Sequence, residues 1–74
     1  MENIGQKIKK IRELKNYSRH YVAGQLEISI TTYGKIERGE IDFTVGRLSH
    51  IAKILDIPMS AIIDFDESIL FKKI

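Results

Sequence analysis

The sequence predicts an all-α protein of five short helices, and two patterns support this prediction. Residues that favour the start of a helix recur along the chain, at Asn3, Ser18, Ser29, Thr44 and Pro58. After each of them, apolar residues recur three or four positions apart, which is the period of a helix with one buried face. With 74 residues, 43% hydrophobic content and no internal repeat, the chain has room for one small helical domain.

The first helix is expected to follow Asn3, which can form a capping box with Gln6 three positions later. Asn16, which tolerates the left-handed backbone conformation, is expected to end it. The apolar stripe of this helix consists of Ile4, Ile8, Ile11 and Leu14. Its lysines occupy the other faces and are interpreted mainly as solubilising residues.

Two further short helices are expected in close succession. Ser18 is expected to cap a second helix that begins at Arg19. Ser29 is expected to cap a third helix, residues 30–38, which ends before Gly39. Both helices turn small and apolar residues inward, namely Val22, Ala23, Leu26, Tyr33 and Ile36. Two such helices joined by a turn of about three residues form a helix-turn-helix, whose second helix can enter the DNA major groove.

The rest of the chain is expected to add two more helices to the core. Ile41 and Phe43 are predicted to anchor the loop that follows the third helix. The fourth helix has the clearest apolar stripe of the chain, made of Leu48, Ile51, Ala52 and Leu55. A short fifth helix is expected after Pro58, with Ile62 and Ile63 turned inward.

Residues 19–39 combine small, apolar and charged positions in a specific order. Ala23 precedes the turn, and Ile28 follows it. The segment ends with serine, a basic residue, an aliphatic residue, glutamate and glycine, here Ser29, Lys35, Ile36, Glu37 and Gly39. In these residues the chain resembles the Cro/C1-type helix-turn-helix family, also called the XRE family, of phage repressors and bacterial regulators. The resemblance extends over residues 4–63 and implies a compact five-helix, lambda-repressor-like domain, here residues 1–66, that binds double-stranded DNA.

The outer face of the expected third helix is the candidate DNA-reading surface, because the other face carries core residues. It presents Ile30, Thr31, Gly34 and Lys35, and the resemblance assigns base contact to the same positions. Ile30 and the Thr31 methyl group can meet a thymine methyl group, while Lys35 can donate to guanine. Gly34 would let the helix backbone come near the DNA. The alternative for Ile30 is a partly buried apolar position.

Hydroxyl and cationic side chains around this face are candidates for contact with DNA phosphates, which fix register without reading sequence. These residues are Arg19, Ser29, Thr32 and Arg47. The family usually has glutamine at the position of Arg19, and arginine can still reach a phosphate with more charge. Glu27, in the turn, stands where the family often has glycine. If the turn needs a positive φ, Glu27 is strained, so we expect either a distorted turn or an ordinary backbone region there.

The resemblance also implies a structural ion pair between the first and third helices. Its members are Arg12 and Glu37. A lone glutamate on a DNA-facing helix would repel phosphate groups, so a guanidinium partner explains why it can be there.

Charge and composition set limits on location and partners. The formal net charge is only +2, but residues 1–53 carry ten Lys/Arg against six Asp/Glu, whereas residues 54–74 carry two against four. The basic part is therefore expected to face an anion. The chain has no cysteine, no apolar run near the roughly 20 residues of a membrane span, and no apolar signal segment. It is expected to act in the cytoplasm, away from the membrane.

No arrangement typical of catalysis or metal binding is found in the sequence, so no enzyme activity, metal or cofactor is expected. His20 and His50 lack metal-ligand spacing. The acidic residues Asp64, Asp66 and Glu67 lack the glycine and glutamate spacing of a calcium loop.

Residues 67–74 form a tail that is too apolar for an ordinary disordered end. Its apolar members are Ile69, Leu70, Phe71 and Ile74. Such a segment either folds back on its own domain or meets a partner chain. In the second case, the tail and the fifth helix form the contact of a homodimer. Its two third helices would lie about 34 Å apart on an inverted-repeat site.

Two hypotheses from different classes account for these features. The first is a sequence-specific DNA-binding transcriptional regulator, acting as a repressor and as a homodimer on an inverted-repeat operator. The second is a helical protein-interaction module of the same fold that does not bind DNA, or an antitoxin paired with a protein partner. Four acidic residues near the presumed DNA face favour the second hypothesis: Glu27, Glu37, Glu40 and Asp42.

Overall fold

The computed structural model describes residues 3–42 and 44–65. Within these residues it contains five helices and no strand, so the predicted all-α, five-helix fold is confirmed. The helices are α1 (Ile4–Leu14), α2 (Arg19–Leu26), α3 (Ile30–Arg38), α4 (Val45–Leu55) and α5 (Met59–Ile63). None of the helices in the described ranges is both long and apolar enough to cross a membrane.

Side-chain caps explain where the first four helices begin. The Gln6 amide donates to Asn3 Oδ1 at 2.8 Å, and the Asn3 amide donates to Gln6 Oε1 at 3.4 Å, which completes the predicted capping box. Ser18, Ser29 and Thr44 each accept, through the side-chain hydroxyl, from the amide three residues later at 3.0 Å. These bonds satisfy amides that have no partner within their own helix. The predicted starts of these helices are therefore correct.

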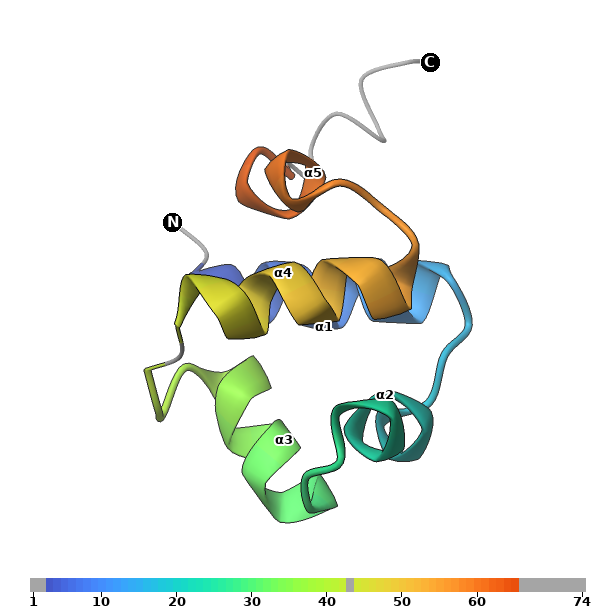
Figure 1. Ribbon diagram of the computed structural model, residues 1–74, viewed down its shortest axis with the longest axis vertical. Coiled ribbons are helices and arrows are strands. Elements are labelled where there is room, and N and C mark those ends of the chain that lie inside the picture. The colour runs from blue at the N-terminus through green and yellow to red at the C-terminus, as the bar shows by residue number, and fades with distance from the viewer. Residues whose placement is uncertain (1–2, 43, 66–74) are drawn as a thin grey trace.

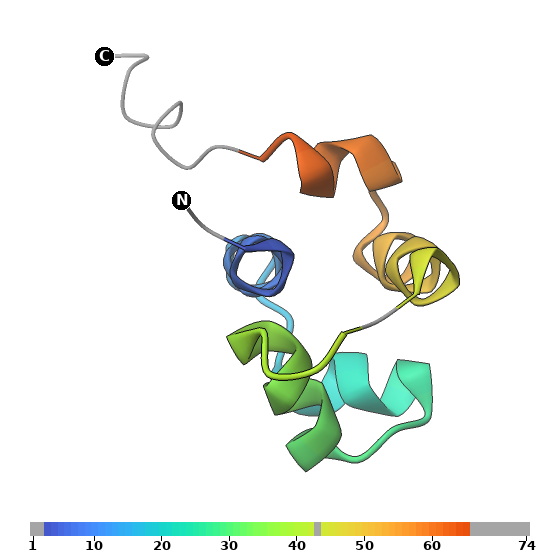
Figure 2. The ribbon, with the colours of Figure 1, turned by 90° about the vertical axis from the view of Figure 1, so that its left-hand side faces the viewer.

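The helices form three levels, as two perpendicular views show (Figures 1 and 2). α1 and α4 run in the same direction through the middle of the molecule, with α5 on one side and the pair α2 and α3 on the other. α1 packs against α3 and α5, while α4 packs against α2 and α5. The helix-turn-helix pair is thus held from behind by α1 and α4, and one side of α3 faces away from the rest of the domain.

All five helices contribute to one apolar core. Its buried members are Ile8, Ile11, Val22, Ala23, Leu26, Tyr33, Ile36, Leu48, Ile51, Ala52, Leu55 and Ile62. Ile41 is half-buried against this core, whereas Phe43, Asp66, Glu67 and the tail at residues 67–74 lie outside the described residues.

Two apolar residues of the predicted stripes do not face the core. Ile63 was expected to turn inward but is 46% exposed, because the adjacent Ile62 takes the inward position and successive helical residues point about 100° apart. Leu14 is 59% exposed, because two steps of three residues from Ile8 rotate it out of the stripe. The C-terminal end of α5 is held instead by a polar contact, in which Lys7 Nζ donates to the Ile63 carbonyl at 2.7 Å.

The turn between α2 and α3 requires a left-handed residue, and Glu27 supplies it. Glu27 has φ 60° and ψ 40°, which lies in the left-handed helical region. The Ile28 amide then bonds to the Ala23 carbonyl at 3.1 Å, which closes the turn after α2. The expectation of an ordinary backbone region at Glu27 is therefore wrong, and the condition stated for strain, a positive φ, is met.

Glu27→Gly is expected to raise the free energy of unfolding by about 1 kcal/mol, because glycine adopts the left-handed conformation without a Cβ clash. Glu27→Ala is the matched control, since it also removes the carboxylate but keeps the Cβ atom. Urea unfolding of both variants measures the difference. Equal stabilities of the glycine and alanine variants would show that this backbone conformation carries no strain.

Candidate nucleic-acid interface

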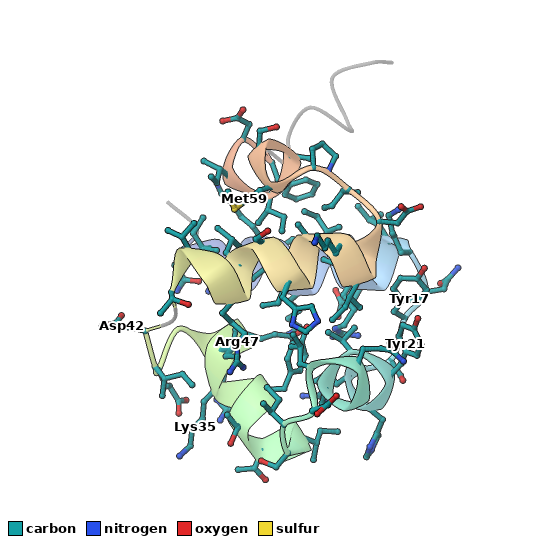
Figure 3. All side chains as sticks on the ribbon, viewed as in Figure 1. Tyr17, Tyr21, Lys35, Asp42, Arg47 and Met59 are labelled. Atoms are coloured by element: carbon teal, nitrogen blue, oxygen red, sulfur yellow. The ribbon has the colours of Figure 1, made fainter. Side chains whose placement is uncertain are left out.

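The rotation of α3 about its own axis is fixed by what it buries. Tyr33 is 0% exposed and Ile36 is 1% exposed, so both side chains are fully within the core. The opposite side of the helix presents Thr31 and Lys35 to solvent, and Ile30 at its N-terminal end is 37% exposed. Lys35 extends away from the body of the molecule (Figure 3).

Gly34 lies on the same outer side of α3 but is covered by a neighbouring side chain. A Cβ atom built on Gly34 would lie 3.1 Å from Arg38 Nη1, so the guanidinium folds back over the glycine. Arg38 was missed in the sequence analysis, although it follows Gly34 by four positions and Lys35 by three. Residues at these spacings share one face of a helix, so the period alone could have identified it.

Arg38 is held in this position by Glu40. Arg38 Nε donates to Glu40 Oε2, and Nη2 donates to Glu40 Oε1 at 3.5 Å. Both side chains are about half exposed, at 54% and 51%. The hydrogen bond from Arg38 lowers the pKa of the Glu40 carboxyl below its usual value, because it stabilises the ionised form.

The candidate phosphate-contacting residues lie around α3 and differ in how far their side chains are exposed to solvent. Arg19, the first residue of α2, is exposed, whereas Thr32 is half-buried. Ser29 is occupied by capping, because its hydroxyl donates to Thr32 Oγ1 at 2.9 Å and accepts from the Thr32 amide. Arg47 is half-buried and extends from α4 toward α3 (Figure 3).

A buried ion pair joins α1 to α3 behind this surface. Arg12 Nε donates to Glu37 Oε2 at 2.7 Å, and Nη2 donates to Glu37 Oε1 at 3.4 Å. Arg12 Nη1 donates to the Tyr17 carbonyl at 2.7 Å, just before α2 begins. Burial by itself would lower the pKa of Arg12, but the hydrogen bond and charge of Glu37 outweigh it and raise this pKa. Arg12 is therefore a permanent cation that links α1 to α3 and to the loop that precedes α2.

Tyr33 lies beside this pair and adds no charge to it. Its hydroxyl is buried and, among the described residues, has no hydrogen-bond partner. Burial, reinforced by the nearby Glu37 carboxylate, raises the pKa of the Tyr33 phenol well above its usual range. Tyr33 thus stays neutral, and Glu37 is the buried carboxylate that Arg12 neutralises there, while the exposed Glu13 carboxylate lies farther away, at 3.9 Å.

The described part of the chain offers no centre for metal chemistry. It contains no group of three or more His, Cys, Asp or Glu side chains that could hold a metal ion. His20 and His50 both lie on the surface.

Sequence and fold together identify the family. A family model described as helix-turn-helix matches residues 8–62, which is more than half of the chain. The chain therefore belongs to the Cro/C1-type (XRE) helix-turn-helix family of DNA-binding transcription regulators. No curated protein matches the sequence.

Solved structures of SinR share this fold. SinR, the master regulator for biofilm formation, in complex with DNA has a TM-score of 0.73 at 27% identity, covering 84% of this chain and 100% of that chain. The N-terminal DNA-binding domain of SinR from Bacillus subtilis gives 0.72 at 26% identity, over 86% and 94% of the two chains. The SinR/SinI protein complex gives 0.73 at 24% identity, over 92% and 72%, and shows the fold alone.

Arg12→Met is expected to lower the free energy of unfolding by about 3–5 kcal/mol, because it leaves the Glu37 carboxylate buried without its cation. Replacing both residues, Arg12→Met with Glu37→Leu, should recover most of this loss. Urea unfolding measures all three proteins. Arg38→Met, which breaks the exposed pair between Arg38 at the end of α3 and Glu40, is the control and should change stability far less. Equal losses in the Arg12 and Arg38 variants would contradict the structural role of the buried pair.

Proposed function

We propose that this protein is a transcriptional repressor that binds an inverted-repeat operator as a homodimer, with α3 of each copy in the major groove. The observation that carries the proposal is the fixed rotation of α3, in which Tyr33 and Ile36 are buried and Lys35 is exposed. A helix anchored on one side and polar or small on the other can lie against the edges of bases. The DNA bound to SinR in one similar structure supports the same use of this fold.

The exposed residues of α3 supply chemistry for reading bases. Ile30 and the Thr31 methyl group can contact a thymine methyl group, and Lys35 can donate to guanine O6 or N7. Gly34 stays in the proposed reading surface, where its lack of a side chain leaves room for the Arg38 guanidinium that covers it. One helix of this size reads few base pairs, so a second copy is needed for useful specificity.

Residues around α3 are proposed to hold the DNA backbone. Arg19 and Arg47 offer charge on two sides of the reading surface, and Thr32 offers a hydroxyl near the start of α3. Ser29 contributes mainly through the capped N-terminus of α3, where backbone amides and the helix dipole favour an anion. These contacts would fix the register of α3 without selecting sequence.

The protein-interaction module, or antitoxin, is the second candidate function, and it rests on the acidic residues near α3. The structure weakens that support, because Glu37 is neutralised by Arg12 and Glu40 is paired with Arg38. Glu27 and Asp42 remain as exposed acidic side chains. A salt-dependent gel shift separates the functions, since phosphate contacts make DNA affinity fall steeply with ionic strength.

The homodimer is proposed to form through the end of the chain that follows α4. Ile63 is 46% exposed and Phe65 is only half-buried, and beyond Ser68 the sequence holds four more apolar residues, Ile69, Leu70, Phe71 and Ile74. Burying such side chains between two copies contributes about 25 cal/mol per Å² of apolar area. α5 and the helix-turn-helix lie on opposite sides of the α1 and α4 level (Figure 2), so this contact would leave both α3 helices free.

Lys35→Ala is expected to weaken binding by about 1–3 kcal/mol on an operator selected from random duplexes, and to relax the preference at one base pair. Arg19→Ala should instead weaken binding equally on selected and random DNA, and reduce the salt dependence. Fluorescence anisotropy at several salt concentrations measures both. A Lys35→Ala loss that is equal on all sequences would move Lys35 to the phosphate contacts.

Ile63→Glu is expected to shift the protein from dimer toward monomer, because it places a charge in the proposed contact. Leu14→Glu is the control, since Leu14 is also an exposed apolar residue but lies at the end of α1. Deletion of residues 68–74 should act in the same direction as Ile63→Glu. Sedimentation equilibrium measures the mass. A parent protein that is monomeric at high concentration, or variants that stay dimeric, would rule out this contact.

A further inference from the structure

We propose that Arg38 donates hydrogen bonds to a DNA backbone phosphate bound in a cavity between α1, α2 and α3. Gly34 and Glu40 hold the Arg38 side chain in position for this contact. The inference rests on the proposed DNA binding and adds a contact that the sequence pattern did not identify. It also gives Gly34 a different role: this glycine leaves room for the Arg38 side chain, instead of letting the α3 backbone contact DNA.

The cavity has the charge and the size for an anion. Its volume is about 260 Å³, and it is lined by Gln6 and Lys9 from α1, Arg19 from α2, and Gly34, Glu37 and Arg38 from α3. Three of these side chains are cationic and Gln6 offers amide donors. The single carboxylate, Glu37, is already paired with the buried Arg12. A phosphate placed here would meet donors from three helices without facing an uncompensated negative charge.

The hydrogen bonds from Arg38 to Glu40 leave the Nη1 group of its guanidinium available for a phosphate. Nε and Nη2 donate to Glu40, whereas Nη1, the atom nearest Gly34, lies on the other side of the group. Arginine has five N–H donors in a rigid plane, so a partner on one edge fixes the direction of the others. Glu40 thus reduces the rotamer freedom that Arg38 would otherwise lose on binding.

Gly34 favours this arrangement because it leaves the guanidinium room that a side chain would reduce. A Cβ atom there would lie 3.1 Å from Nη1, which is tighter than ordinary contact, so Arg38 would have to move. The glycine is otherwise unfavourable, since it sits in the interior of a helix. Gly34→Ala is therefore expected to stabilise the fold while it weakens DNA binding.

The test measures DNA affinity by fluorescence anisotropy for Arg38→Gln, Gly34→Ala and the double variant, on selected and random duplexes. Arg38→Gln should weaken binding about tenfold on both kinds of DNA and lower the slope of log affinity against log salt by about 1. Lys53→Gln is the matched control, because it removes an exposed cation from α4, outside the cavity, and should leave affinity nearly unchanged. Thermal melts confirm that each variant is folded.

The double variant distinguishes the two roles of Gly34. If Gly34 seats Arg38, Gly34→Ala weakens binding in the parent but has no further effect when Arg38 is already glutamine. An equal loss of DNA affinity in both backgrounds would show that the backbone at Gly34 contacts DNA, and would contradict the role of Gly34 in positioning Arg38. Unchanged affinity of Arg38→Gln, with Arg19→Ala still weakened, would overturn the Arg38 contact alone. A parent that binds no DNA would overturn the proposed function as well.

Discussion

The buried contact between Arg12 and Glu37 is the interaction on which the presentation of α3 depends. A carboxylate and a guanidinium taken out of water are each unfavourable alone, and they are tolerated only as a hydrogen-bonded pair. Because Arg12 also bonds to the Tyr17 carbonyl, one side chain connects α1, the start of α2 and the end of α3. The pair therefore fixes the position of α3 relative to α1 through two directed hydrogen bonds. An apolar contact of the same size has no such directional preference.

The sequence predicted helix starts well because each start has a local chemical cause. Capping side chains such as Asn3 and Ser18 act within three residues, so the pattern contains all the information that is needed. The side-chain directions of short helices were less predictable. α5 has only five residues, and the sequence offers Ile62 and Ile63 as equal candidates for one inward position. Only packing against α1 and α4 decides between them.

The candidate interface could be predicted in outline but not in detail. The exposure of Lys35 follows from helical period once Tyr33 and Ile36 are assigned to the core. The cover over Gly34 could not be predicted in the same way, because it depends on which rotamer Arg38 adopts and on a partner beyond the helix end. The same limit applies to Glu40, which was interpreted as an acidic residue opposed to DNA and is instead paired with a cation.

The contacts of α1 have a consequence for synthesis of the chain. α1 leaves the ribosome before any of its partners, yet its Lys7 bonds to a carbonyl 56 positions later in α5. At about 5–20 residues per second, this gap corresponds to roughly 3 to 11 s of translation. During that interval the part of α1 that packs against α5 lacks the surface that will cover it. The domain can therefore complete its fold only after α5 has emerged. Until then, the side of α1 that faces α5 stays exposed to solvent.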